Sequence, residues 1–340
     1  MLILELTLGQ KMQKGSAGAI RGITPRLGGI GWVASFAGFI TALVYCIFLS
    51  IACIYLVTNG SEPWNMAWED RPIGCKTARS AATTGAEIFL YLNIAKYYSP
   101  DTCKPFEYGK ESFKFAGELF IAVLIVWVIC FFCIFKGVKS IQAVTMISVP
   151  APFIFLFACM AYYISLNKAN VSAGQATGLD FYWGKEGFPL ISPDKYGNLY
   201  YDPAQFADKR FGDAVNHAFF SVGVCVGVMA AYASYHPIKA PVIRNSFIIV
   251  ASDFTFSILA GFLAWSVIGF LQAKNNITYA QTSSTGLTFI AFPVAATLDE
   301  GGRAWFGVFM FLMFIAGIDS AFSYMESVVT NVIDFTRCTR

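Results

Sequence analysis

Four ionisable side chains stand out within the apolar stretches of this 340-residue sequence, where a charged group is energetically costly. They are His217, Asp253, Asp319 and Glu326. In membrane-embedded helices such residues usually face the interior of the helix bundle and belong to a functional site. They are therefore our first candidates for contact with an ion or a substrate.

Asp319 and Glu326 belong to a polar stripe that also contains Ser320 and Ser323. Their separations of three, four and seven residues place them on one face of a helix. Carboxylate, hydroxyl and carbonyl oxygens together are the ligands that hard cations prefer. The stripe predicts a cation site, and the alternative is a buried carboxylate that neighbouring helices satisfy through hydrogen bonds. Asp253 has the same two interpretations.

Two glycines interrupt the apolar segment 214–235 near its middle. Gly223 and Gly227 are flanked by valines, and both residue types weaken a helix. This pattern is typical of a discontinuous membrane helix whose broken ends face ions and substrate. The alternative is a contact face of small residues between two packed helices.

Long apolar segments make up most of the chain, and each is long enough to cross a bilayer, which takes about 20 residues. Hydrophobic residues form 56% of the sequence and charged residues only 13%, which excludes an ordinary soluble domain. The sequence predicts an all-α, polytopic membrane protein with six full spans and a short helical remnant at residues 1–9. The predicted spans are 30–57, 116–135, 141–166, 214–235, 246–271 and 305–333.

Basic residues without any acid occupy alternate connections between the spans. By the positive-inside rule these connections, and with them both ends of the chain, are cytoplasmic. The net charge of +3 follows from this asymmetry and predicts no nucleic-acid partner. The residues concerned are Lys11, Lys14, Arg21, Arg26, Lys136, Lys139, Lys239, Arg244, Arg337 and Arg340.

The connections on the other side, 58–115, 167–211 and 272–304, are predicted to be extracellular. Cys75 and Cys103 are the cysteines in these loops, and a pair in an oxidising compartment predicts a disulfide. Asn170 and Asn276 each begin a glycosylation sequon on the same side. The apolar stretch 286–298 is too short to cross, so we expect it to fold back as an extracellular cap.

Several short motifs resemble the neurotransmitter:sodium symporter family. They lie at residues 4–10 (LELTLGQ), 25 with 29–31 (P, GIG), 136–140 (KGVKS), 219–223 (FFSVG), 233–235 (ASY) and 317–320 (GIDS). The resemblance covers nearly the whole chain, which forms a single partial transporter domain. It runs from the end of helix 2 (1–9) through helices 3, 4, 5, broken helix 6 and helix 7 to helix 8 (305–333). The family's helix 1 and helices 9 to 12 have no counterpart here.

The resemblance implies an incomplete inverted-repeat, leucine-transporter-type bundle at the plasma membrane. It implies sodium-coupled symport of an amino acid, or an amine derived from one, by alternating access. Ser221 and Asp253 would belong to the first sodium site. Asp319 and Ser320, with the backbone carbonyl of Ala316, would belong to the second. The resemblance also implies that Cys75 and Cys103 form the family's extracellular-loop disulfide.

The same resemblance places further residues at the substrate. Tyr45 matches the helix 3 tyrosine whose hydroxyl meets the substrate, and Phe220 and Val226 match pocket-lining positions on broken helix 6. Ser320 would touch the substrate as well as sodium. The residue that separates amino-acid carriers from monoamine carriers lies on the family's helix 1, which has no counterpart here. The substrate is therefore predicted only as a small molecule, either an amino acid or an amine derived from one.

Chloride dependence is left open by two departures from the family pattern. Asp253 stands where the family usually has an asparagine, and His217 where it usually has a glutamine near chloride. Ser221 and Ser257 match chloride-site positions. A fixed carboxylate beside that site would supply the negative charge that chloride otherwise provides.

Two other classes of protein compete with a symporter. An intramembrane aspartyl protease would use Asp253 and Asp319, but its Gly-x-Gly-Asp context is missing. The third class is a non-transporting polypeptide, either a truncated remnant or a fragment that associates with full-length partners. No oligomeric state follows from the sequence.

Overall fold

The computed structural model describes residues 1–72, 75–76, 84–99, 115–170, 178–182, 192–193, 199–200, 203–275 and 286–336. Helices dominate this part of the chain, as the sequence predicts. A two-residue antiparallel pair joins β1 (Ser192–Pro193) and β2 (Leu199–Tyr200). The fold class is thus the predicted all-α membrane bundle.

Five helical stretches in the described part of the chain are long and apolar enough to cross a membrane. They contain α3, α6, α7 with α8, α12 and α15. The sixth predicted segment, 214–235, is divided between α10 and the short helix α11. The bounds are Gly28–Thr58 for α3, Gly117–Ile134 for α6, Val138–Ser148 for α7, Pro150–Asn170 for α8, Pro203–Val222 for α10, Val228–Ala233 for α11, Val242–Asn275 for α12 and Gly302–Thr336 for α15.

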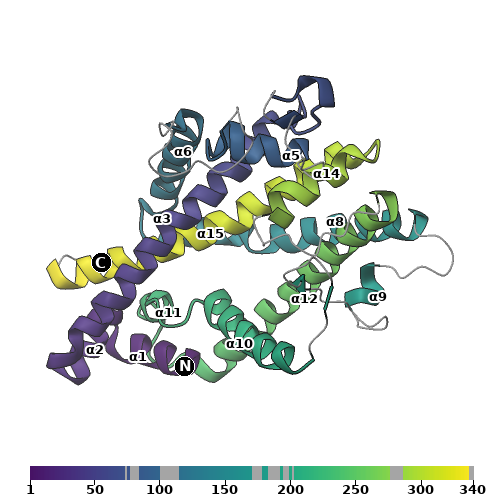
Figure 1. The fold of residues 1–340 in the computed structure, drawn as a ribbon. Coiled ribbons are helices and arrows are strands. Elements are labelled where there is room, and N and C mark those ends of the chain that lie inside the picture. Colours follow the sequence, from purple (N-terminus) through teal and green to yellow (C-terminus); the bar gives the residue numbers. More distant parts are fainter. Residues whose placement is uncertain are drawn as a thin grey trace.

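The centre of the bundle is the crossing of α3 with α15, which Figure 1 shows running through the middle of the molecule. Small residues allow the close approach. A Cβ atom at Gly317 would lie 2.1 Å from Leu49 Cδ2, so a larger residue there would require the end of the Leu49 side chain to move. On α3 the buried residues Ser35, Ala42 and Leu49 recur every seven positions and form one face. The crossing therefore fixes α15, which carries the polar stripe, against α3.

One end of the bundle holds α1 (Leu2–Met12), α2 (Ser16–Ile23), the 3₁₀ turn η1 (Pro25–Leu27) and the end of α15 (Figure 1). The opposite end holds α5 and α14. The other short elements at this end pack around α5 and α14, and α9 packs on α12. The bounds at this end are Trp68–Asp70 for η2, Gly85–Ile88 for α5, Phe89–Ile94 for η3, Gly178–Tyr182 for α9, Leu287–Ala291 for η4 and Phe292–Thr297 for α14.

An aromatic cluster closes this second end. The Tyr55 ring is fully buried, and its hydroxyl donates a hydrogen bond of 2.8 Å to the Phe289 carbonyl. Its ring centroid lies 5.3 Å from that of Trp64, 5.2 Å from Phe89 and 5.9 Å from Phe306. Rings at these spacings stabilise the contact beyond the apolar area they bury. The apolar stretch 286–298, predicted as a cap, supplies Phe289 to this cluster.

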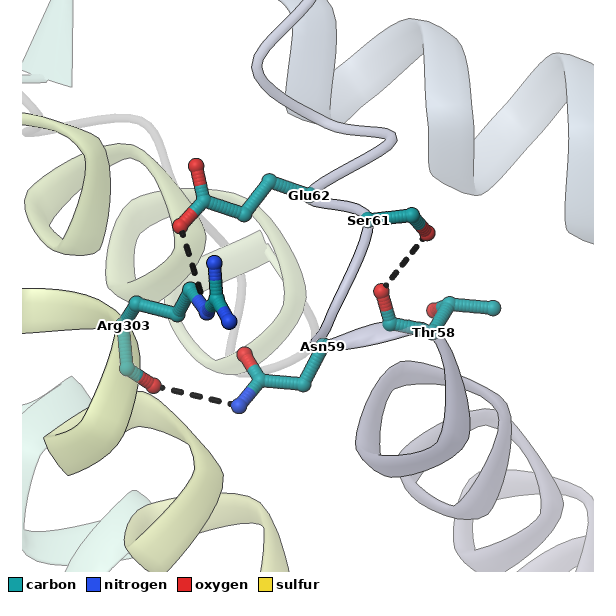
Figure 2. A network of polar contacts seen from close by, with 5 residues as sticks. All are labelled: Thr58, Asn59, Ser61, Glu62 and Arg303. Carbon is teal, nitrogen blue, oxygen red and sulfur yellow. Dashed lines mark hydrogen bonds and ion pairs between the residues drawn. The ribbon is translucent and has the colours of Figure 1, made fainter.

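Polar contacts tie the end of α3 to the start of α15 at the same place (Figure 2). The Asn59 side-chain amide donates to the Arg303 carbonyl at 3.2 Å, and Arg303 Nε lies 3.9 Å from Glu62 Oε1. Ser61 donates to the Thr58 carbonyl at 3.0 Å, where α3 ends. Exposed ion pairs of this kind add little stability. Their effect is to fix where the chain leaves α3.

Two predictions concern residues of these outer connections. Cys75 is buried beside Ile88, whereas Cys103 lies outside the described residues. Asn170 is the last residue of α8, and its side-chain amide donates to the Leu166 carbonyl at 2.8 Å. Asn276 also lies outside the described residues. The disulfide and both glycosylation sites therefore stay predictions.

Candidate functional site

The helix breaks between α10 and α11, at residues 223–227. Gly223, Cys225 and Gly227 have φ angles of 68°, 69° and 77°, all in the left-handed region. The chain turns out of α10 through hydrogen bonds from the amides of residues 223 and 224 to the carbonyls of Phe220 and Phe219. The glycines thus act as the sequence predicts, and the break exposes backbone groups that need new partners.

Glu5 on α1 satisfies one of these groups. Its Oε1 accepts a hydrogen bond of 2.7 Å from the Cys225 amide. Its other oxygen, Oε2, is buried and has no partner among the described residues, so it can accept from one further donor. Glu5 was not among the predicted site residues. The signal that could have identified it is an acid in an otherwise apolar helical stretch.

A buried polar cluster supports the other side of the break. It consists of Ser16, Ser35, Ser327 and Asn331, which come from α2, α3 and α15. Ser35 lies 3.1 Å from both Ser16 and Ser327, measured between hydroxyl oxygens, and Asn331 donates to Ser16 at 2.9 Å. A Cβ atom at Gly227 would lie 2.8 Å from the hydroxyls of Ser16 and Ser327. The break is therefore anchored to elements on both of its sides.

A cavity of about 640 Å³ lies against the break. Residues of α7, α10, α11 and α15 line it, including Ser221, Gly223, Asp319 and Ser320. It also reaches His236, which follows α11. The structure thus brings residues predicted for both sodium sites to the wall of one cavity, although they come from segments about 100 positions apart.

Ser221 and Asp253 are in direct contact. The Ser221 hydroxyl donates a hydrogen bond of 2.5 Å to Asp253 Oδ1, joining α10 to α12. A hydroxyl bonded to a carboxylate is a short, strong pair, and both groups can offer oxygen to a cation. His217 lies one turn before Ser221 and is exposed, and Ser257 lies one turn after Asp253. The residues predicted around the first sodium and chloride sites therefore share two facing helical segments.

Asp319 lies on the cavity wall and is half-buried. Its Oδ1 accepts a hydrogen bond of 2.6 Å from Ser148, which ends α7 just before the interruption at Val149. Ser320 lies beside it on the same wall. Carboxylate and hydroxyl oxygens on a cavity wall fit the needs of a hard cation. Ala316 precedes this pair by about one turn of α15.

Glu326 matches the alternative, structural interpretation of the stripe. Its side chain is only 2% exposed. Its Oε1 accepts hydrogen bonds from Tyr235 at 3.0 Å and from Thr330 at 3.1 Å. Ser323, between the two acids, pairs with Tyr232 at 2.7 Å. The stripe therefore combines one carboxylate on the cavity wall with one enclosed by neighbouring side chains.

The residues predicted to contact the substrate do not all lie together in the structure. Tyr45 lies close to Ser320 and lines a smaller, mainly apolar cavity of about 200 Å³ beneath Phe289 of the aromatic cluster. Val226 packs with Ala42, and its carbonyl accepts a hydrogen bond of 3.3 Å from Ser327. Phe220 is 59% exposed. Tyr45 and Ser320 are brought together, whereas Phe220 lies apart from them in this structure.

Comparison with known proteins assigns the chain to a family. The model of the sodium:neurotransmitter symporter family matches residues 1–340. The chain belongs to this family. Its relatives are transporters, which excludes the interpretation as a membrane protease.

Individual relatives are distant and longer than this symporter-family chain. It is 27% identical to the bovine sodium- and chloride-dependent GABA transporter 2 over 344 residues, covering 98% of the chain and 53% of the relative. It is 26% identical to the dog sodium- and chloride-dependent taurine transporter, with 98% and 52% covered. The chain therefore spans about half the length of these relatives.

A solved structure shows the same fold. The crystal structure of MhsT in complex with L-phenylalanine matches the symporter-family chain with a TM-score of 0.69 at 17% identity. The match covers 98% of this chain and 62% of MhsT. The arrangement of the described helices is thus that of a known transporter bundle.

The Glu5 contact generates a test of what holds the break. Glu5→Ala leaves the Cys225 amide without its acceptor, so we expect a loss of about 1–3 kcal/mol and a lower melting temperature of the purified protein. Glu5→Gln keeps an acceptor oxygen and should restore much of the loss. Glu118→Ala, an exposed acid at the start of α6, is the matched control. A Glu5→Ala protein that melts with the wild type would contradict the role.

Proposed function

We propose that this chain forms the central part of a sodium-coupled symporter for an amino acid or an amine derived from one. The observation that supports this most strongly is the cavity at the helix break, which has Ser221 beside Asp253 on one side and Asp319 with Ser320 on another. Family membership supplies the class of transport, and the cavity supplies a place for ions. The named GABA and taurine transporters carry small zwitterions, which fit a cavity of this size.

Two sodium sites follow from this proposal. The first uses Ser221 and Asp253, whose oxygens already lie together. The second uses Asp319 and Ser320 with the carbonyl of Ala316. When bound, sodium supplies positive charge that draws on the membrane potential and offsets the carboxylates. The chain's own role is to hold these oxygens around a space of fixed size.

The substrate is proposed to bind between Tyr45, Ser320 and the broken helix, with Val226 beside them. Phe220 would complete the pocket only after α10 moves toward these residues. The Tyr45 hydroxyl is close enough to Ser320 for one ligand group to meet both. Free backbone groups of a broken helix recognise the charged ends of a zwitterion. The break thus joins ion binding and substrate binding at one place.

Alternating access has a structural counterpart at the two ends of the bundle. The aromatic cluster around Tyr55 covers the end that the charge pattern assigns to the outside. The cavity, in contrast, reaches His236 at the end assigned to the cytoplasm. This arrangement favours an inward-facing state of a plasma-membrane carrier with both chain ends in the cytoplasm.

A non-transporting remnant that associates with partner chains is the second candidate. It is favoured by one observation, which is that the chain spans about half the length of its relatives. The two candidates differ in sodium binding. A symporter part with formed ion sites should be stabilised by sodium, whereas a remnant needs no such response.

Asp319 provides the test of the proposed function. Asp319→Ala removes an ionised ligand, so we expect the apparent sodium affinity to fall roughly 10- to 100-fold. The measurement is the melting temperature of the purified protein in increasing sodium, with choline replacing sodium to keep ionic strength constant. The transport counterpart is sodium-driven uptake in proteoliposomes.

Two controls separate ion binding from folding in this test. Glu62→Gln changes an acid that follows the outer end of α3, far from the proposed ion sites, and should leave the sodium response unchanged. The Asp319→Ala protein without sodium should melt close to the wild type. An unaltered sodium response in a folded Asp319→Ala protein would contradict the assignment.

Asp253 generates a prediction about chloride. If its carboxylate supplies the negative charge beside Ser221, uptake should persist when gluconate replaces chloride, because a second anion there would be repelled. Asp253→Asn should weaken uptake or make it chloride-dependent. Ser257→Ala, one turn away on α12, tests whether the hydroxyl alone matters. Equal chloride dependence of wild type and Asp253→Asn would show that the carboxylate has no such role.

The proposed orientation is tested by labelling introduced cysteines. A cysteine at Lys239, between α11 and α12, should react with a membrane-impermeant reagent only after the cells are permeabilised, since that connection is basic and free of acids. A cysteine at exposed Ser61 should react in intact cells. The reverse pattern would mean that the bundle is inserted the other way.

A further inference from the structure

A side chain of α7 reaches the proposed second sodium site. The Ser148 hydroxyl donates a hydrogen bond of 2.6 Å to Asp319 Oδ1 and so joins α7 to α15. Within the described part of the chain, Ser148 is the side chain that donates to this carboxylate, which leaves Oδ2 for another partner. A role for Ser148 here rests on the proposed function, because that proposal makes Asp319 a sodium ligand.

Ser148 is buried next to the cavity wall. It is 5% exposed, whereas Thr145 and Val149 on either side of it line the cavity together with Asp319. A hydroxyl in this position reaches an ion through the carboxylate that it contacts. Hydrogen-bonding partners of metal ligands commonly act in this way, because they fix the orientation of the ligand.

The Ser148 hydroxyl has one proton and two acceptors within reach. The second acceptor is the carbonyl of Val144, one turn earlier in α7, at 3.0 Å. Ser148 could therefore be satisfied within its own helix. Its shorter contact is with Asp319, in the distance range of a hydroxyl that donates to an ionised carboxylate. The bond to Asp319 thus follows from the charge of the carboxylate and is not required to satisfy a buried hydroxyl.

The number of donors distinguishes Asp319 from the other acid of the polar stripe. Glu326 Oε1 accepts from two hydroxyls, those of Tyr235 and Thr330. Asp319 Oδ1 accepts from one. A single donor on one oxygen restricts the rotation of the carboxylate, while most of its charge stays available to an ion.

We propose that Ser148 is a positioning residue for sodium. Its hydroxyl holds Oδ1 of Asp319, so that Oδ2 is presented to the ion beside Ser320. The affinity of the second sodium site then depends on a hydroxyl of α7 as well as on the ligands of α15.

Sodium affinity of the full purified chain tests the proposal. Ser148→Ala should weaken apparent sodium binding about tenfold, measured from the melting temperature in increasing sodium with choline as the replacement ion. Thr145→Ala is the matched control. It removes a hydroxyl from the same helix that bonds only to the carbonyls of Ile141 and Gln142, so it should leave the affinity unchanged. Equal sodium affinities of Ser148→Ala and wild type overturn the proposal.

Two further variants separate hydrogen bonding from packing. Ser148→Thr keeps the hydroxyl and should bind sodium close to the wild-type affinity. Ser148→Cys keeps the shape of the side chain but is a much weaker donor, so its affinity should stay low. Wild-type affinity in Ser148→Cys would show that the volume of the side chain matters and its hydrogen bond does not, which overturns the proposal.

A measurement without sodium tests the contact itself. Difference infrared spectra between wild type and Asp319→Asn, both in choline, identify the carboxylate stretching band of Asp319. Ser148→Ala should shift this band, because the carboxylate loses its donor, and Thr145→Ala should not. An unshifted band in Ser148→Ala overturns the proposal.

The same titrations distinguish this inference from the proposed function. A wild type whose melting temperature does not respond to sodium contradicts the proposed function and, with it, the role of Ser148. A wild type that responds to sodium, loses the response in Asp319→Ala and keeps it unchanged in Ser148→Ala contradicts only the role of Ser148.

Discussion

The break between α10 and α11 is the constraint on which the rest of the site depends. Backbone amides and carbonyls freed inside a membrane bundle must find partners within the protein, because lipid offers none. Glu5 accepts from the Cys225 amide on one side, and Ser327 donates to the Val226 carbonyl on the other. These contacts come from α1 and α15. The cavity exists because helices distant in sequence hold the two broken ends apart.

The two acids of the polar stripe on α15 differ in how far the protein buries them. Glu326 is buried, and its Oε1 receives two hydrogen bonds from hydroxyls, so that oxygen is already engaged by the protein. Asp319 lies seven residues earlier on the same face, borders the cavity and receives its bond from Ser148. A carboxylate enclosed in this way stabilises the bundle, whereas one on a cavity wall can exchange partners with an ion. The same helix thus carries a structural acid and a proposed ligand.

Sequence patterns predicted the features that depend on local spacing. The apolar segments became the helices, and Gly223 and Gly227 adopted the left-handed backbone that ends α10. The pairing of Ser221 with Asp253 followed from family resemblance, since no local pattern joins residues 32 positions apart. The partners Glu5 with Cys225 and Ser148 with Asp319 were missed. These contacts depend on how α1 and α7 pack. A single polar residue in an apolar segment does not show which distant residue it will contact.

Asn331 links the end of α15 to the helix break. It donates hydrogen bonds to Ser16 and Ser35, which border Gly227 at the helix break. Contacts couple two sites when the connecting elements have two discrete arrangements that each site can bias. Gly227 has no space for even a Cβ atom between these hydroxyls, so movement of the break requires the cluster to rearrange. The end of α15 therefore lies one hydrogen-bonded layer from the segment that shapes the proposed ion site.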